Sequence, residues 1–214
     1  MKRFFPPPHL VLVPAMLYTA LSCGKAPGSD RCPKPDAVSG ATRQAAKPKQ
    51  EKSPPTHPDY QLLGSRAGLK GSAVRYDAQL VRGGMPLTEQ AAAAWKEWGI
   101  RTVISVNPEE EERRICEKHG LALVELPFPL EVGPGEEDLR RFLDTVRTGR
   151  GPFYVHCVGG TQRAGVLGAA YRIHHLGWHA DRAVVDFARL GGNLQENHHM
   201  VEKVLSFVPQ KEQP

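Results

Sequence analysis

Five residues lie between a cysteine and an arginine in the segment Phe153-Tyr154-Val155-His156-Cys157-Val158-Gly159-Gly160-Thr161-Gln162-Arg163. The apolar start of this segment predicts a strand, the two glycines predict a loop, and the residues from Arg163 onward predict a helix. Backbone N–H groups of such a loop converge on one point, and the N-terminus of the helix adds positive potential there. The segment therefore predicts an anion-binding cradle with a thiol at its base.

Cys157 and Arg163 carry the chemistry of this cradle. The amide dipoles and Arg163 stabilise a thiolate, so the thiol of Cys157 loses its proton easily. The planar guanidinium of Arg163 holds two phosphate oxygens in a bidentate fork. We therefore predict Cys157 as the nucleophile, and as the phosphate-binding set Val158, Gly159, Gly160, Thr161, Gln162 and Arg163.

Strand and helix patterns alternate along the chain from residue 79 onward. Short apolar or β-branched runs predict strands at residues 79–82, 100–106, 121–126 and 153–156. Amphipathic patterns predict a helix from the N-cap Thr88 to Trp98, and further helices at residues 109–119, 136–147, 163–176, 181–190 and 195–207. The alternation predicts an α/β fold with a central, mostly parallel sheet flanked by helices. Ligands of such sheets bind at the carboxyl ends of the strands, where Cys157 lies.

The motif around Cys157 resembles that of a known family. The order His156, Cys157, Gly160, Arg163 fits H-C-x-x-G-x-x-R, the signature of the protein tyrosine phosphatase superfamily. Residues 81–86 (VRGGMP) and 99–104 (GIRTVI) resemble the opening of compact bacterial dual-specificity-type phosphatases, and the pairs Tyr171-Arg172 and Gly177-Trp178 resemble the same group. The resemblance covers residues 79–190 and implies the cysteine-phosphatase fold.

The resemblance implies hydrolysis of phosphate monoesters in two steps. The Cys157 thiolate attacks phosphorus to form a phosphocysteine while a carboxylic acid protonates the leaving oxygen, and the conjugate base then activates water. His156 would hold the loop and support the thiolate. No metal or other cofactor is required, and the expected substrate is a phosphorylated protein or a small phosphomonoester.

Two positions depart from the pattern of the family. Ala164 follows the arginine where the family carries Ser or Thr, whose hydroxyl assists departure of the thiolate, so slow breakdown of the phosphocysteine is expected. The family's Asp general acid is missing from residues 126–133. Glu131 is the nearest carboxylate, on a Pro/Gly-rich loop that could swing, and is the candidate general acid. The acidic residues at 136–138 instead suit the first turn of a helix.

Two other functions are compatible with the same residues. Ala164 and the missing Asp would suit a catalytically weak or inactive phosphate-binding module. A rhodanese-like sulfur transferase also presents a cysteine on a loop. The five residues between Cys157 and Arg163, with His156 before the cysteine, favour the phosphatase over the sulfur transferase.

Other polar clusters have structural explanations. The helical histidines lack the spacing of zinc ligands, so no metal site is expected at His174, His175, His179, His198 and His199. The acidic run Glu109–Glu112, followed by two arginines, is typical of a solvated helix face. Cys116, in the same helix, is expected to be a packed thiol.

The N-terminal part of the chain predicts export. Lys2 and Arg3 precede a short apolar run that ends in Ala20-Leu21-Ser22-Cys23-Gly24, which resembles the lipobox of bacterial lipoproteins. We expect residues 1–23 to be a signal with lipidation at Cys23, giving an exported lipoprotein anchored in the cell envelope; a secreted protein is the alternative. Residues 24–59 predict a disordered, basic, Pro-rich tether, and residues 60–214 the phosphatase domain.

The positive charge lies in that N-terminal part. The net charge is +5, and residues 24–58 carry seven Lys or Arg against three Asp or Glu. Residues from 59 onward carry 19 Lys or Arg against 20 Asp or Glu. A nearly neutral folded part argues against nucleic-acid binding, whereas a basic tether suits the anionic headgroups of a membrane. We expect a monomer held at the membrane through its N-terminal lipid.

Overall fold

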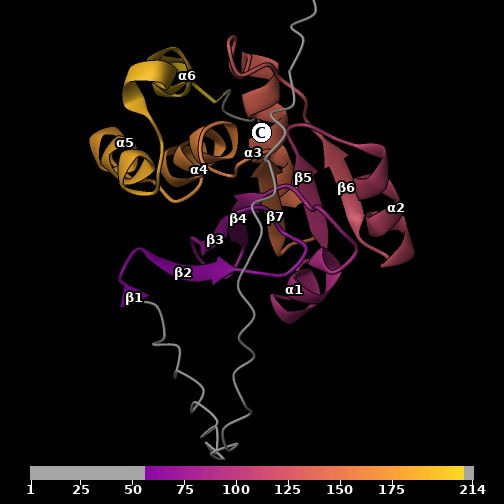
Figure 1. The fold of residues 1–214 in the computed structure, drawn as a ribbon. Helices are drawn as coiled ribbons and strands as arrows, with labels where there is room; N and C mark the ends of the chain where they lie inside the picture. Colours follow the sequence, from indigo (N-terminus) through magenta and orange to yellow (C-terminus); the bar gives the residue numbers. More distant parts are fainter. Residues whose placement is uncertain (1–55, 210–214) are drawn as a thin grey trace, which may run out of the picture. The chain divides into compact units, whose positions relative to one another are not determined.

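The computed structural model describes residues 56–209 (Figure 1). Its strands are β1 (Thr56–His57), β2 (Tyr60–Ser65), β3 (Ser72–Arg75), β4 (Leu80–Gly84), β5 (Thr102–Ser105), β6 (Ala122–Glu125) and β7 (Phe153–Cys157). Its helices are α1 (Ala91–Glu97), α2 (Glu110–Lys118), α3 (Glu136–Thr148), α4 (Arg163–His174), α5 (Ala180–Arg189) and α6 (Leu194–Ser206). The strands form one sheet in the order β1-β2-β3-β4-β7-β5-β6.

Strands β4, β7, β5 and β6 are parallel to one another and confirm the predicted α/β fold. The strands β4, β5 and β7 are buried along their whole length, which explains why they are short apolar runs rather than alternating patterns. Gly84 pairs with Cys157, and Ser105 pairs with His156. The carboxyl ends of three neighbouring strands therefore meet around Cys157.

Strands β1, β2 and β3 add an antiparallel edge that the sequence analysis did not predict. β2 pairs with β1 and β3, and β3 pairs with β4. A register shift between Leu62 and Gly64 interrupts β2, so its residues lack a clear two-residue period. β1 begins at Thr56, four residues before the boundary expected at residue 60.

Helices cover both faces of the sheet (Figure 1). Successive side chains of a strand point to opposite faces. In β7, Phe153 and Val155 pack with the layer of α3, α4, α5 and α6, whereas Tyr154 packs with α1 and α2. The same alternation turns His156 toward the α1 and α2 layer and Cys157 toward α4. Neighbouring residues of one strand thus meet different layers.

The predicted helices are present, with small differences at their ends. Ala91, Ala94 and Trp95 lie on the buried face of α1, but Gln90 is the N-cap and no side chain caps the helix, so the expected cap at Thr88 is wrong. In α3 the acidic first turn is confirmed, and Leu139, Phe142 and Val146 are buried. The Asp138 carboxylate accepts from the N–H of Gly135, a bond that suits the positive end of the helix.

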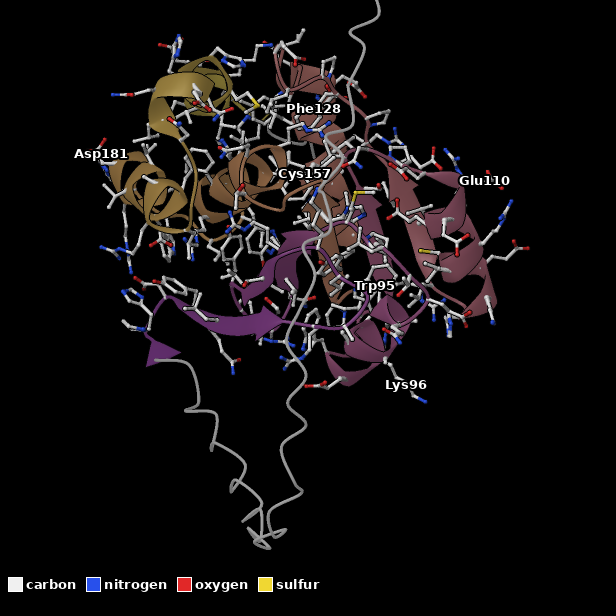
Figure 2. All side chains as sticks on the ribbon, viewed as in Figure 1. Trp95, Lys96, Glu110, Phe128, Cys157 and Asp181 are labelled. Carbon is white, nitrogen blue, oxygen red and sulfur yellow. The ribbon has the colours of Figure 1, made fainter. Side chains whose placement is uncertain are left out.

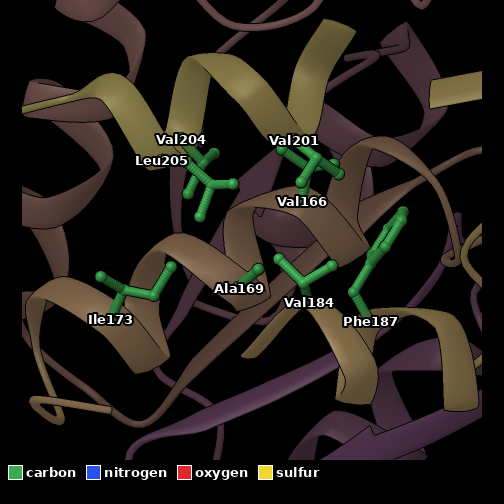
Figure 3. Close-up of a pocket in the computed structure, with 8 residues that line it drawn as sticks. All are labelled: Val166, Ala169, Ile173, Val184, Phe187, Val201, Val204 and Leu205. Atoms are coloured by element: carbon green, nitrogen blue, oxygen red, sulfur yellow. The ribbon is translucent and has the colours of Figure 1, made fainter. Parts of the chain in front are cut away.

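An apolar crevice lies between α4, α5 and α6 (Figure 3). It is lined by Val166, Ala169, Ile173, Val184, Phe187, Val201, Val204 and Leu205. No polar side chain and none of the predicted site residues lines it. The crevice is therefore part of the packing of the helical layer and does not belong to the phosphate site.

The predictions for the signal, for Cys23 and for most of the tether concern residues outside the described range 56–209. Within that range, no helix combines the length and the apolar character that crossing a bilayer requires.

Candidate active site

The predicted strand, loop and helix come together as one unit around Cys157. β7 ends at Cys157, residues 158–162 form the loop, and α4 begins at Arg163. Within residues 56–209, the six backbone N–H groups of residues 158–163 donate to no acceptor. Backbone N–H groups are nearly always paired in folded proteins, so a row of free donors at a helix N-terminus forms a site for an anion.

Two carbonyl groups of this loop, those of Val158 and Thr161, are bound to the surrounding structure instead. The N–H of Met85 donates to the carbonyl of Val158 at 3.4 Å. The buried Arg82 guanidinium donates through Nη1 to the carbonyl of Thr161 at 3.4 Å and through Nη2 to that of Leu190 at 3.0 Å. These contacts fix the loop from outside and leave its N–H groups for a ligand.

Gly160 is required where the loop crosses the end of β4. Its φ is +76°, a conformation that other residues rarely adopt. A Cβ at this position would lie 2.3 Å from the carbonyl carbon of Gly83. A Cβ at Gly84 would likewise lie 2.0 Å from the carbonyl oxygen of Lys70, and one at Gly83 would lie 2.2 Å from the Tyr154 hydroxyl, so residues 83, 84 and 160 are all glycines.

The side chain of Gln162 faces the helical layer. Its Oε1 accepts from the N–H of Asn193 at 3.0 Å and from Nδ2 of Asn197 at 2.8 Å. Its Nε2 donates to the carbonyl of Gly191 at 3.2 Å. Gln162 can therefore serve a phosphate only through its backbone N–H, while its side chain holds the loop against α6.

Cys157 and Arg163 lie at the two ends of the cradle, as predicted. Cys157 is 3% exposed and forms no disulfide. Arg163 donates through Nη1 to the carbonyl of Phe128 at 3.1 Å; Figure 2 labels Phe128 and Cys157. The guanidinium has five N–H donors, so this bond leaves the others for a bidentate contact with an anion.

Residues 126–135, which connect β6 and α3, are held down at three alternate carbonyls. Arg163 binds the carbonyl of Phe128, Nε2 of His199 contacts that of Leu130 at 3.0 Å, and Nζ of Lys203 donates to that of Val132 at 2.7 Å. In this structure the loop is thus tied to α4 and α6. We call these three contacts the loop clamp.

Glu131 lies on the exposed turn of this loop. Among the described residues, it makes no hydrogen bond and no ion pair. The structure brings together Cys157, residues 158–162, Arg163 and His156, and it places Glu131 three residues after Phe128, the contact of Arg163.

The acidic run was expected to lie on a solvated helix face, and for Glu112 this is wrong. Glu112 is 2% exposed, and its Oε1 binds Nε2 of the fully buried His156. Its Oε2 accepts from the hydroxyl of Ser105 at 2.7 Å. A signal was present in the sequence, because Glu112 precedes the apolar Ile115 and Cys116 by three and four residues and shares their helix face.

Burial controls the protonation of two neighbours of this network. It raises the pKa of Cys116 to about 12, and the Glu112 carboxylate adds to the shift, so Cys116 stays a thiol at neutral pH. The packed thiol expected at Cys116 is confirmed. Burial likewise raises the pKa of Tyr154, with further contributions from Cys157 and Glu112. The protonated Tyr154 hydroxyl donates to the carbonyl of Gly84 at 2.7 Å.

The helical histidines do not form a metal site within the described residues, where no group of three or more His, Cys, Asp or Glu side chains could hold an ion. His198 is exposed, as expected for a solvated face. His199 is half-buried in the loop clamp, and Nε2 of His174 contacts the carbonyl of Val204 at 3.3 Å.

Comparison with known proteins identifies the family. Residues 61–202, more than half of the chain, match the family described as DSP-PTPase phosphatase fused to NAD+ kinase. No curated protein matches the chain. Among solved structures, TpbA of P. aeruginosa is similar with a TM-score of 0.60 at 20% identity, over 71% of this chain and 92% of TpbA.

Two further structures share the fold. TpbA in complex with phosphotyrosine has a TM-score of 0.59 at 19% identity, over 70% of this chain and 91% of that one. The catalytic core of the PP-IP phosphatase Siw14 from S. cerevisiae has a TM-score of 0.53 at 16% identity, over 62% and 82%. The chain therefore belongs to the DSP-PTPase family, within the protein tyrosine phosphatase superfamily, and is by class a cysteine-dependent phosphoric monoester hydrolase.

Proposed function

We propose that the protein hydrolyses phosphate monoesters through a phosphocysteine formed on Cys157. The observation that carries this proposal is the row of six unpaired N–H groups at residues 158–163, which begins directly after Cys157 and ends at Arg163. Six fixed donors suit the three outer oxygens of a phosphoryl group. They need no reorganisation when negative charge moves onto those oxygens in the transition state.

In the first step the Cys157 thiolate attacks phosphorus. The S–P bond forms as the bond between phosphorus and the leaving oxygen breaks, and Glu131 gives its proton to that oxygen. Arg163 binds two of the outer oxygens in its fork while its Nη1 keeps the contact with Phe128.

In the second step water attacks the phosphocysteine. The Glu131 carboxylate takes a proton from the water, the S–P bond breaks, and inorganic phosphate leaves with the thiolate restored. Ala164 supplies no hydroxyl to assist the departing sulfur, so this step is the slower one.

The substrate we propose is phosphotyrosine in a protein or a small aryl or alkyl phosphate. The complex of TpbA with phosphotyrosine supports the first choice. Val158 in the cradle is 36% exposed, and Leu130, next to the candidate acid Glu131, is 39% exposed; such apolar side chains suit an aromatic leaving group. We further propose that the protein acts in the cell envelope, anchored by a lipid on Cys23.

Hydrolysis of p-nitrophenyl phosphate by the purified protein tests the function. We expect turnover that vanadate inhibits competitively, because vanadate occupies the same cradle as the transferred phosphoryl group. Vanadate binding without turnover would contradict the proposal and favour an inactive phosphate-binding module. A sulfur transferase would instead transfer sulfur from thiosulfate to cyanide, and we expect no such transfer.

A further inference from the structure

We propose that Glu112 is a positioning residue of the active site, which fixes the His156 imidazole and through it the end of β7 that carries Cys157. The proposal deepens the proposed function, since its kinetic readout rests on phosphatase turnover. The contacts that carry it do not depend on that function.

Glu112 bridges two strands from a helix. Ser105 of β5 and His156 of β7 are register partners at the carboxyl ends of their strands. The Glu112 carboxylate, from α2, uses one oxygen for each of them. The N–H of Val106 adds a bond of 3.0 Å to the carbonyl of His156. These contacts hold His156, the residue before the nucleophile, through both its side chain and its main chain.

The neighbours of Glu112 show that its burial is specific. Glu110 and Glu111 are 68% and 58% exposed and pair with Arg113 and Arg114 on the surface. Burying a carboxylate is costly unless its oxygens are hydrogen-bonded, and an apolar residue of similar size would fill the space at lower cost. The hydrogen bonds to Ser105 and His156 therefore explain why a carboxylate is buried at this one position.

The imidazole depends on Glu112 for its orientation. Among the described residues, Nδ1 of His156 has no hydrogen-bond partner, so Nε2 carries the only hydrogen bond of the ring. Without Glu112 the ring loses that bond and can change its tautomer and tilt. The peptide that joins His156 to Cys157 would then be held less firmly, and the thiolate would be less reactive.

Two substitutions distinguish the role of the Glu112 hydrogen bonds from that of its negative charge. In Glu112→Gln the amide oxygen still accepts from His156, and the amide nitrogen donates to the Ser105 hydroxyl, which can rotate to accept. In Glu112→Leu both partners are left unpaired. Glu111→Gln and Glu111→Leu are the matched controls on the exposed face of the same helix.

We expect Glu112→Leu to lower kcat on p-nitrophenyl phosphate by about tenfold or more while KM changes less than about threefold, because the amides and Arg163 still bind phosphate. Glu112→Gln should stay within about threefold of the wild type, and the controls should not differ from it. Thermal unfolding of each variant shows whether it is folded at the assay temperature.

Alkylation of Cys157 by iodoacetamide, mapped by mass spectrometry, provides a readout that needs no turnover. Glu112→Leu should slow it and Glu112→Gln should not. In a His156→Ala background Glu112→Leu should add little, because Glu112 acts through His156. Three results would each overturn the proposal. Glu112→Leu could keep the wild-type kcat and alkylation rate, or Glu112→Gln could lose as much activity as Glu112→Leu. In the His156→Ala background, Glu112→Leu could still have its full effect. If the protein has no turnover at all, the proposed function fails while alkylation still decides the role of Glu112.

Discussion

We assign Arg163 two contacts, one to the loop of residues 126–135 and one to the phosphate, which a single ammonium group could not make together. Its Nη1 contacts the carbonyl of Phe128 on the loop of the candidate acid, and among the described residues its remaining donors have no partner, which leaves them for a phosphate. A guanidinium does both because its donors are spread over a rigid plane, whereas a lysine concentrates its charge on one nitrogen.

Arg163→Lys should therefore lower kcat/KM for aryl phosphates by at least about tenfold, which corresponds to about 1.4 kcal/mol of transition-state stabilisation. Arg140→Lys is the control, since Arg140 pairs with Glu137 on the surface. Steady-state kinetics of both variants measure the effect. A smaller loss in Arg163→Lys would contradict the bidentate role.

Ala164 decides which step limits turnover. It is fully buried at the start of α4. With no hydroxyl at position 164, breakdown of the phosphocysteine should be slow, and rapid mixing should show a burst of phenol close to one equivalent of enzyme. Ala164→Ser should raise the steady-state rate more than the burst rate. A rate that falls steeply with leaving-group pKa, without a burst, would instead show that the first step limits turnover.

The sequence was sufficient to place the candidate site residues that local spacing brings together. Cys157, Arg163 and His156 belong to one strand, loop and helix, so their arrangement follows from the chain itself. Glu112 comes from 45 residues away, within four consecutive glutamates of which only one is buried. A run of identical residues hides the member that packing selects, although its spacing to Ile115 and Cys116 points to it.

At the scale of elements, the loop of residues 126–135 carries the candidate acid Glu131 and depends on neighbouring helices for its position. The loop clamp ties three of its carbonyls to Arg163, His199 and Lys203, so α4 and α6 together hold the segment that carries Glu131. If Glu131 is the general acid, loosening the loop should impair protonation of the leaving group rather than binding of phosphate.

Lys203→Met should thus lower kcat by about threefold or more for aryl phosphates with poor leaving groups and leave good leaving groups nearly unchanged. Methionine keeps most of the length of the side chain but loses the donor to Val132. Lys96→Met, on α1 (Figure 2), is the control. If Lys203→Met lowered kcat equally for poor and good leaving groups, the result would contradict a role of the loop clamp in acid catalysis.

The clarity of the hydrophobic pattern in the sequence explains which strands and helices could be predicted. Three of the parallel strands, β4, β5 and β7, are buried along their whole length, and the parallel strands stand out as short runs between amphipathic helices. The antiparallel edge does not, because β1 has two residues and β2 is interrupted at Gly64. Thr88 looked like a helix cap from its residue type alone, but the helix begins three residues later, at Ala91.

At the scale of the molecule, the chain combines a phosphatase domain with an N-terminal part of different composition. The phosphatase family match spans residues 61–202. The lipobox-like Ala20-Leu21-Ser22-Cys23-Gly24 and the basic residues after it remain a sequence-based prediction.

Lipidation at Cys23 should place the protein in the membrane fraction of the cells that express it, held by acyl chains with the basic residues near anionic headgroups. Cys23→Ala should move it out of that fraction. Cys32→Ala, nine residues later, is the matched control and should change nothing. Unchanged fractionation of Cys23→Ala would leave a secreted protein as the better explanation.

The covalent intermediate on Cys157 is the central claim, and trapping it is the most direct test. The protein is mixed with an aryl phosphate, quenched in acid within the burst, digested and analysed by mass spectrometry. We predict one phosphate on Cys157, none on Cys116 because burial raises its pKa to about 12 and keeps it a thiol, and none in Cys157→Ser, which should still bind vanadate. Turnover without phosphate on Cys157, or turnover that persists in Cys157→Ser, would contradict the claim.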